Sequence, residues 1–241
     1  MNIAVIFAGG IGVRMKSKEK PKQFLALYNK PVIIRTIEHF EHHPQIDAIV
    51  VACVDGWIDH LKDLISQYQI TKVCSVVPGG KTGQLSIYNG LCEAEKIADG
   101  DDAIVLIHDG VRPLIDRDVI TANIENTKKF GSAITCGTVK ETILLVDEDT
   151  NMIKNVPSRK SSRVAKAPQS FYLKDILDAQ RKSIARGETD WIDSCTLMAN
   201  EGYTLHLIDG NDDNIKITTP DDFYTARALI DAKDAAQMFE E

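Results

Sequence analysis

Short apolar runs alternate with amphipathic segments along the first half of the chain, and this alternation limits the possible folds more than any other feature. Residues 3–7, 48–54, 73–77 and 103–107 are rich in β-branched side chains and nearly free of polar ones, as expected for strands buried on both faces. The segments between them carry apolar residues at helical spacing. The pattern therefore predicts an α/β fold with a mainly parallel sheet flanked by helices.

The pattern changes from about residue 134. Residues 133–136 and 142–146 are predicted strands, and a turn cluster follows at residues 147–151. Residues 151–166 are polar and basic, with few side chains that could join a core. We interpret residues 140–167 as a β-arm that protrudes from the sheet.

The last part of the chain returns to regular structure. Its predicted elements are helices at 176–184, 196–200 and 221–236 and strands at 205–208 and 215–217. The last helix would be capped by Thr219-Pro220-Asp221. No repeat or linker divides the sequence, so we expect a single domain, residues 1–241, with an arm.

Composition narrows the possible functions. With 28 basic and 35 acidic residues among 241, the net charge is −7, which argues against general binding to nucleic acid. No apolar run approaches the roughly 20 residues of a membrane span, and the start lacks the basic segment of a signal peptide. Five cysteines without CxxC spacing are expected to be buried hydrophobes rather than metal ligands or disulfides. We therefore expect a cytoplasmic protein without membrane or nucleic-acid partners.

A glycine loop follows the first predicted strand. Its sequence, residues 8–15, is AGGIGVRM, and glycines in such a loop let backbone N–H groups approach phosphate oxygens. Met15 breaks the dinucleotide fingerprint GxGxxG, and no GK[ST] of the NTPase phosphate loop is present. Two cations, Arg14 and Lys22, flank the loop and suit a triphosphate, although a plain turn beside a solvated basic loop is an equal possibility.

The loop together with Pro21-Lys22-Gln23 resembles the opening of the cytidylyltransferases that activate polyol phosphates, the 2-C-methyl-D-erythritol 4-phosphate and ribitol-5-phosphate cytidylyltransferases. Further motifs of that family follow in order, namely Gly79-Gly80, Ser86, HDGVRP at 108–113, Ala167-Pro168-Gln169, Asp193 and NIKIT at 214–218. The resemblance implies a Rossmann-like fold of the nucleotide-diphospho-sugar transferase type. It also implies a reaction in which CTP and a polyol phosphate give a CDP-polyol and pyrophosphate, with Mg²⁺ as cofactor.

The same resemblance assigns roles to the nucleotide side of the site. Arg14 and Lys22 would neutralise charge on the α-phosphate and on the departing pyrophosphate, and Lys216 would approach from the other side. The residues implied to bind CTP are Ala8, Gly9, Gly10, Gly12, Gly79, Gly80, Ser86, Asp109 and Gly110. Ser86 could also cap the following helix. Asp109 is the first candidate ligand for Mg²⁺ or the ribose, with Asp213 second.

On the acceptor side, the implied contacts are Arg112, Thr142, Arg159 and Asp193. Arg159 lies on the arm, which in the resembling enzymes crosses to the neighbouring subunit of a homodimer; Arg163 and Lys166 are alternatives for its role. His108 is expected to be a structural hydrogen bonder, because this reaction needs no proton shuttle.

The acceptor itself is the open question. Ala8-Gly9-Gly10, Ile192-Asp193-Ser194 and Glu141-Thr142-Ile143 depart from the erythritol-phosphate pattern toward the ribitol type. D-Ribitol 5-phosphate is therefore the leading acceptor, which would make the product a cell-wall or capsule precursor. The alternatives are the erythritol-phosphate enzyme of isoprenoid synthesis and a nucleotide-binding paralogue without turnover. The last of these stays open because Gly83 replaces an arginine of the base-reading loop, for which Lys81 could compensate.

Overall fold

The computed structural model describes residues 1–10, 20–100 and 102–239, without side chains from residue 236 on, so Gly12 and Arg14 lie outside the described residues. A seven-stranded sheet with the order β11-β7-β10-β6-β1-β4-β5 forms its centre. The strands are β1 (Asn2–Ala8), β4 (Ala48–Cys53), β5 (Val73–Pro78), β6 (Ile104–Asp109), β7 (Ser132–Thr138), β10 (Arg163–Tyr172) and β11 (Leu207–Asp209). Neighbouring strands are parallel except around β10, which is antiparallel to both β6 and β7. The predicted α/β fold with a mainly parallel sheet is confirmed.

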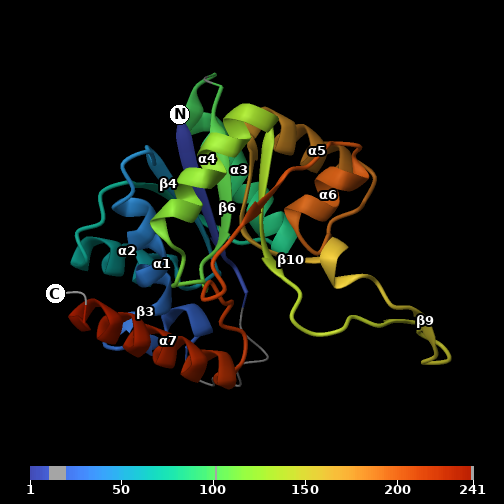
Figure 1. The fold of residues 1–241 in the computed structure, drawn as a ribbon. Helices are drawn as coiled ribbons and strands as arrows, with labels where there is room; N and C mark the ends of the chain where they lie inside the picture. The colour runs from blue at the N-terminus through green and yellow to red at the C-terminus, as the bar shows by residue number, and fades with distance from the viewer. Residues whose placement is uncertain (11–19, 101, 240–241) are drawn as a thin grey trace.

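Helices cover both faces of this sheet (Figure 1). They are α1 (Val32–Glu41), α2 (Ile58–Gln67), α3 (Gly83–Ala98), α4 (Arg117–Phe130), α5 (Leu173–Ala185), α6 (Ser194–Asn200) and α7 (Pro220–Phe239). Successive residues of β1 point to opposite faces. Ala4 and Ile6 pack in the cluster with α1, α2 and α4, while Ile3 and Val5 pack in the cluster with α3, α5 and α6. Burial on both faces explains the continuous apolar sequences of β1 and β4. Among the described helices, none is both long and apolar enough to cross a membrane.

Helix α7 lies outside these two layers, next to the short strands β2 (Ala26–Leu27) and β3 (Lys30–Pro31) (Figure 1). Its Ala226 belongs to a third apolar cluster that also contains Leu27 and Ile217. Ile217 N donates to Val111 O at 2.9 Å. Residues 215–217, which the sequence predicts as a strand, are therefore not a strand, but an extended segment held against the end of β6.

The arm is a hairpin of β8 (Leu145–Val146) and β9 (Ile153–Asn155), a separate two-stranded sheet that projects from the body (Figure 1). β8 is shorter than the predicted strand at residues 142–146, because only two cross-strand pairs form. The arm also ends before residue 167, since Arg163 already pairs with Thr138 in the main sheet.

Candidate active site

Two cavities adjoin the carboxyl ends of β1 and β6, where open α/β sheets bind their ligands. The first, about 490 Å³, is bounded by the glycine loop, the turn η2 (Lys22–Phe24) and the start of α3; we call it the glycine cavity. The second, about 400 Å³, lies along β10 and the start of α6; we call it the β10 cavity. Phe7, Gly83, Asp109 and Lys216 line both cavities. The two spaces are therefore neighbours with a shared wall.

The predicted nucleotide contacts mostly gather in the glycine cavity. Its wall contains Ala8, Gly9, Gly10, Gly80, Ser86 and Asp109, together with Lys22, Lys81 and Lys216. Gly79 and Gly110 support the wall from behind. A Cβ on Gly79 would lie 2.9 Å from Gly9 Cα, so these two loops can approach only because both residues are glycines.

Ser86 has a different role from the predicted helix cap. The cap of α3 is Thr82, whose side chain accepts from Leu85 N at 3.1 Å. Ser86 lies in the first turn, where its Oγ donates to Thr82 O at 2.9 Å and accepts from Gly80 N at 3.0 Å. It therefore fixes the loop that follows β5.

Gln23 is a positioning residue to which the sequence assigned no role. Its side chain is buried, and its Nε2 donates to Ala8 O at 2.7 Å and Gly10 O at 3.2 Å. These bonds tie the glycine loop to η2. They keep the neighbouring Lys22 in the wall of the glycine cavity.

Asp109 is held between two cations at the shared wall. Lys216 Nζ lies 2.6 Å from its Oδ1, and Arg112 Nε lies 2.8 Å from its Oδ2. Burial alone would raise the pKa of Asp109, but the charges of Lys216 and Arg112 outweigh burial and lower that pKa to about 2. Arg112 also donates to Asn214 O at 2.8 Å. The ionised carboxylate thus fixes Lys216 where the two cavities meet.

The ion pairs of Asp109 affect its predicted role as a ligand for Mg²⁺. Both oxygens of Asp109 already contact cations, and Asp213 faces Lys233 at 3.7 Å and lines neither cavity. In the part of the chain that the structure describes, no group of three or more His, Cys, Asp or Glu side chains is placed to hold a metal ion. The donor set therefore does not fit a Mg²⁺ site built from protein side chains.

His108 is buried beside Asp109. Its Nε2 lies 3.2 Å from Arg112 O, to which the protonated nitrogen donates. Burial lowers the pKa of His108 to about 3, against the opposing charge of Asp109. The ring is therefore neutral near pH 7 and supports the loop that carries Arg112.

In the β10 cavity, Asp193 caps α6. Its Oδ1 accepts from Thr196 N at 2.8 Å, and Gln169 Nε2 donates to its Oδ2 at 3.0 Å. Burial would raise the pKa of Asp193, but the hydrogen bonds from Thr196 and Gln169 lower it overall. Ile192 stands on the cavity wall with 89% of its surface exposed. Asp193 and Arg112 thus share the β10 cavity.

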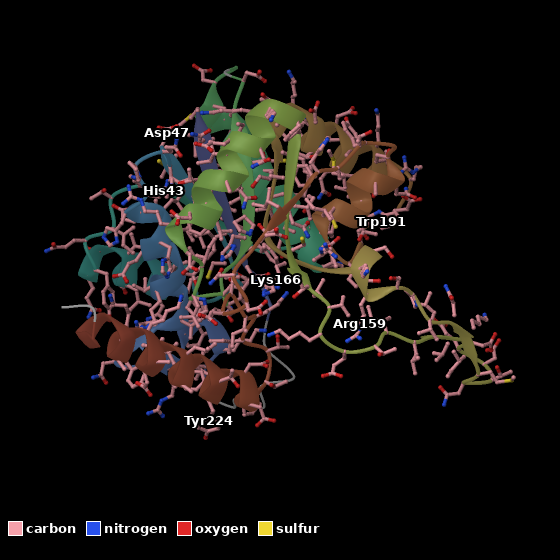
Figure 2. The ribbon with its side chains drawn as sticks, viewed as in Figure 1. His43, Asp47, Arg159, Lys166, Trp191 and Tyr224 are labelled. Atoms are coloured by element: carbon pink, nitrogen blue, oxygen red, sulfur yellow. The ribbon has the colours of Figure 1, made fainter. Side chains whose placement is uncertain are left out.

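The other two predicted acceptor contacts lie elsewhere in the chain. Thr142 and Arg159 are exposed in the arm and line neither cavity. Figure 2 shows Arg159 on a limb of the arm, outside the main body, where its NH1 donates to Lys140 O at 3.2 Å. Within one chain, Thr142 and Arg159 therefore do not reach either cavity.

Gly83 stands where the resemblance leads one to expect an arginine. It begins α3 and lines both cavities, and a Cβ there would meet nothing within 4 Å. The space beside Gly83 is therefore open, and a longer side chain at this position could reach into the glycine cavity. Lys81, two residues earlier, lines the glycine cavity.

The geometry is that of two adjacent cavities with a shared wall, and comparison with known proteins assigns the family of the chain. The model of the family described as IspD, 2-C-methyl-D-erythritol 4-phosphate cytidylyltransferase, matches residues 2–232. The chain belongs to this family. It is a cytidylyltransferase, an enzyme of the nucleotidyltransferase class, as the sequence motifs predicted.

Individual relatives refine this placement. The chain is 53% identical over 239 residues to the ribitol-5-phosphate cytidylyltransferase of Streptococcus agalactiae serotype V, covering 99% of both chains. It is 35% identical over 230 residues to the 2-C-methyl-D-erythritol 4-phosphate cytidylyltransferase of Clostridium botulinum strain Okra, covering 95% of this chain and 97% of that one. The crystal structure of 4-diphosphocytidyl-2C-methyl-D-erythritol synthase from Anaerococcus prevotii superimposes with a TM-score of 0.81 at 27% identity, over 95% of this chain and 96% of that one.

Proposed function

We propose that this enzyme transfers the cytidylyl group of CTP to D-ribitol 5-phosphate, forming CDP-ribitol and releasing pyrophosphate. The observation that carries the proposal is the pair of cavities that share Asp109 and Lys216 in one wall. Such an arrangement suits two anionic substrates that must meet. The higher identity to the relative named for ribitol 5-phosphate favours this acceptor over the erythritol phosphate.

In this proposal, CTP occupies the glycine cavity and the acceptor occupies the β10 cavity. An oxygen of the acceptor phosphate attacks the α-phosphorus of CTP, the new P–O bond forms, and the bond to the β-phosphate oxygen breaks. Because the nucleophile is already ionised, no base is needed, and catalysis comes from positioning and charge neutralisation. In this arrangement Lys216 contacts both substrates, and Lys22 neutralises charge on the triphosphate. Arg14 is proposed to neutralise charge on the triphosphate together with Lys22.

Mg²⁺ is proposed to arrive with CTP, bound by phosphate oxygens. Magnesium ions often keep few protein ligands and rely on substrate phosphates, which agrees with the paired state of Asp109. Bound there, the ion would withdraw charge from the triphosphate. Asp109 is then assigned to hold Lys216 and Arg112 in place.

The acceptor assignment is tested by measuring pyrophosphate release with CTP, Mg²⁺ and a panel of polyol phosphates. We expect kcat/KM for ribitol 5-phosphate to exceed that for 2-C-methyl-D-erythritol 4-phosphate by at least about tenfold. Faster reaction with the erythritol phosphate would instead favour the enzyme of isoprenoid synthesis. Calorimetric binding of CTP without any product would favour a paralogue that has lost turnover.

We also propose that the enzyme works as a homodimer in the cytoplasm. Leu145, Val146 and Ile153 of the hairpin are 43–60% exposed in the single chain, and a two-stranded hairpin is only marginally stable by itself. All five cysteines, each within the described residues, are free, as is usual in a reducing compartment. Sedimentation at micromolar concentration is expected to give a dimer, and a monomer would contradict the proposal.

The arm leads to a kinetic prediction. Arg159→Ala is expected to raise KM for the polyol phosphate by roughly tenfold, because a cation from the neighbouring arm is lost, while KM for CTP changes little. Arg163→Ala is the comparison variant, because Arg163 is an alternative for the same role; its guanidinium donates to the carbonyls of Lys160 and Ser162. If Arg163→Ala raises the acceptor KM and Arg159→Ala leaves it unchanged, the role belongs to Arg163.

A further inference from the structure

Lys166 in the wall of the β10 cavity differs from the other two cationic side chains there in its contacts. Arg112, Lys166 and Lys216 all line this cavity. Arg112 and Lys216 both pair with Asp109. Lys166 Nζ instead donates to two backbone carbonyls, Asn211 O at 3.0 Å and Asp212 O at 3.2 Å, and no carboxylate of the described residues forms an ion pair with it.

Lys166 lies near carboxylates, but none of the described residues forms an ion pair with it. Its side chain is half-buried and extends across Gly137 of β7, where a Cβ would come within 2.9 Å of Lys166 Cε. Burial lowers the pKa of Lys166, the charge of Asp212 opposes this, and the nearby positive charge of Arg112 adds to it. The carboxylate of Asp212 is itself bound by Lys140 at 2.9 Å. An anion that enters the cavity could therefore form a direct ion pair with Lys166.

A second group in the same wall lacks a partner. Ser194 is only 2% exposed and lines the β10 cavity, yet its Oγ has no hydrogen-bond partner among the described residues. Buried hydroxyls are normally satisfied. The strand that carries Lys166 also fixes this part of α6, because Gln169 accepts from Cys195 N at 2.8 Å and donates to Asp193.

We propose that Lys166 binds the phosphate of the acceptor and that Ser194 Oγ binds one of its hydroxyls. The inference rests on the proposed function, since it requires a polyol phosphate in the β10 cavity. Figure 2 shows Lys166 at the base of the sheet within the main body, whereas Arg159 lies outside it on the arm. Lys166 is therefore a phosphate contact that each chain supplies to its own acceptor, independently of the neighbouring subunit.

The test uses the full-length enzyme and steady-state pyrophosphate release. Lys166→Met is expected to raise KM for ribitol 5-phosphate by about 10- to 100-fold, the usual loss for a charge-assisted hydrogen bond. KM for CTP stays close to the wild-type value, because CTP occupies the other cavity. Lys166→Arg should restore most of the acceptor affinity.

Lys140→Met is the matched control for a merely structural role. It removes a cation that anchors the same loop through Asp212 but lines neither cavity. If it raises the acceptor KM as much as Lys166→Met does, or if Lys166→Met leaves that KM unchanged, the assignment of Lys166 is wrong. A wild-type enzyme silent with ribitol 5-phosphate would instead contradict the proposed function, and the comparison is then made with the polyol phosphate that the enzyme accepts.

Ser194→Ala is measured with ribitol 5-phosphate and with its series of monodeoxy analogues. We expect the acceptor KM to rise by about two- to tenfold. The analogue that lacks the hydroxyl bound by Ser194 should lose its disadvantage in this variant. Thermal stability should not fall, because Ser194 Oγ makes no internal hydrogen bond. Unchanged discrimination across the whole series would overturn the role of Ser194.

Discussion

Lys216→Met is expected to lower kcat by about a thousandfold, the scale found when one group that stabilises developing charge is removed. Lys216 faces both cavities, and its ammonium contacts Asp109 at 2.6 Å. Methionine keeps the length and apolar stem of lysine but cannot neutralise the two phosphates as they approach. The effect should appear in kcat at saturating CTP and acceptor, measured as pyrophosphate release.

The same substitution leaves Asp109 with Arg112 as its remaining ion-pair partner, so stability must be followed beside activity. Lys30→Met is the matched control, because it also removes a lysine from an ion pair, with Glu38 at 2.7 Å, away from both cavities. It should lower the melting temperature slightly without changing kcat. A loss of less than about tenfold in kcat for Lys216→Met would contradict the role of Lys216.

Four of the predicted strands, β1, β4, β6 and β7, are buried on both faces, and their apolar composition distinguishes them in the sequence. β10 is an inner strand, between β7 and β6, and was missed because several of its side chains make polar contacts. Gln169 binds Asp193, Ser170 Oγ donates to Asn123 Oδ1 at 2.8 Å, and the strand has a bulge between Ala165 and Gln169 that accommodates Pro168. Its sequence therefore lacks the apolar run of its neighbours.

Helix α4 was missed for a related reason. Its buried face includes Asn123 and Thr127 beside Val119, Ile120 and Ile124. Asn123 Nδ2 bonds Val119 O and Thr135 Oγ1, and Thr127 Oγ1 bonds Asn123 O. These hydrogen bonds allow polar side chains to be buried on the inner face of α4. Polar residues at buried positions interrupt the apolar period by which a helix is identified from sequence.

Part of the candidate site could likewise be predicted from the sequence, and part could not. Carboxyl ends of parallel strands meet at one edge, which is why residues 8–10 and Asp109 could be placed together from sequence. The pairing of Asp109 with Lys216 could not be predicted, because it depends on the extended segment held against Val111 and on the packing of α7. Asp109, the first candidate ligand for a metal or the ribose, forms ion pairs with two cations from its own chain.

Lys22→Ala is expected to lower kcat by about two to four orders of magnitude while KM for CTP changes only a few-fold. Lys22 lines the glycine cavity beside the loop that Gln23 fixes. There it would meet the charge that grows on the departing pyrophosphate, an interaction stronger in the transition state than in bound CTP. Lys20→Ala is the matched control, since Lys20 is exposed and lines neither cavity. If Lys22→Ala weakens CTP binding by the same factor as it lowers kcat/KM, Lys22 serves binding alone and the proposed charge neutralisation is wrong.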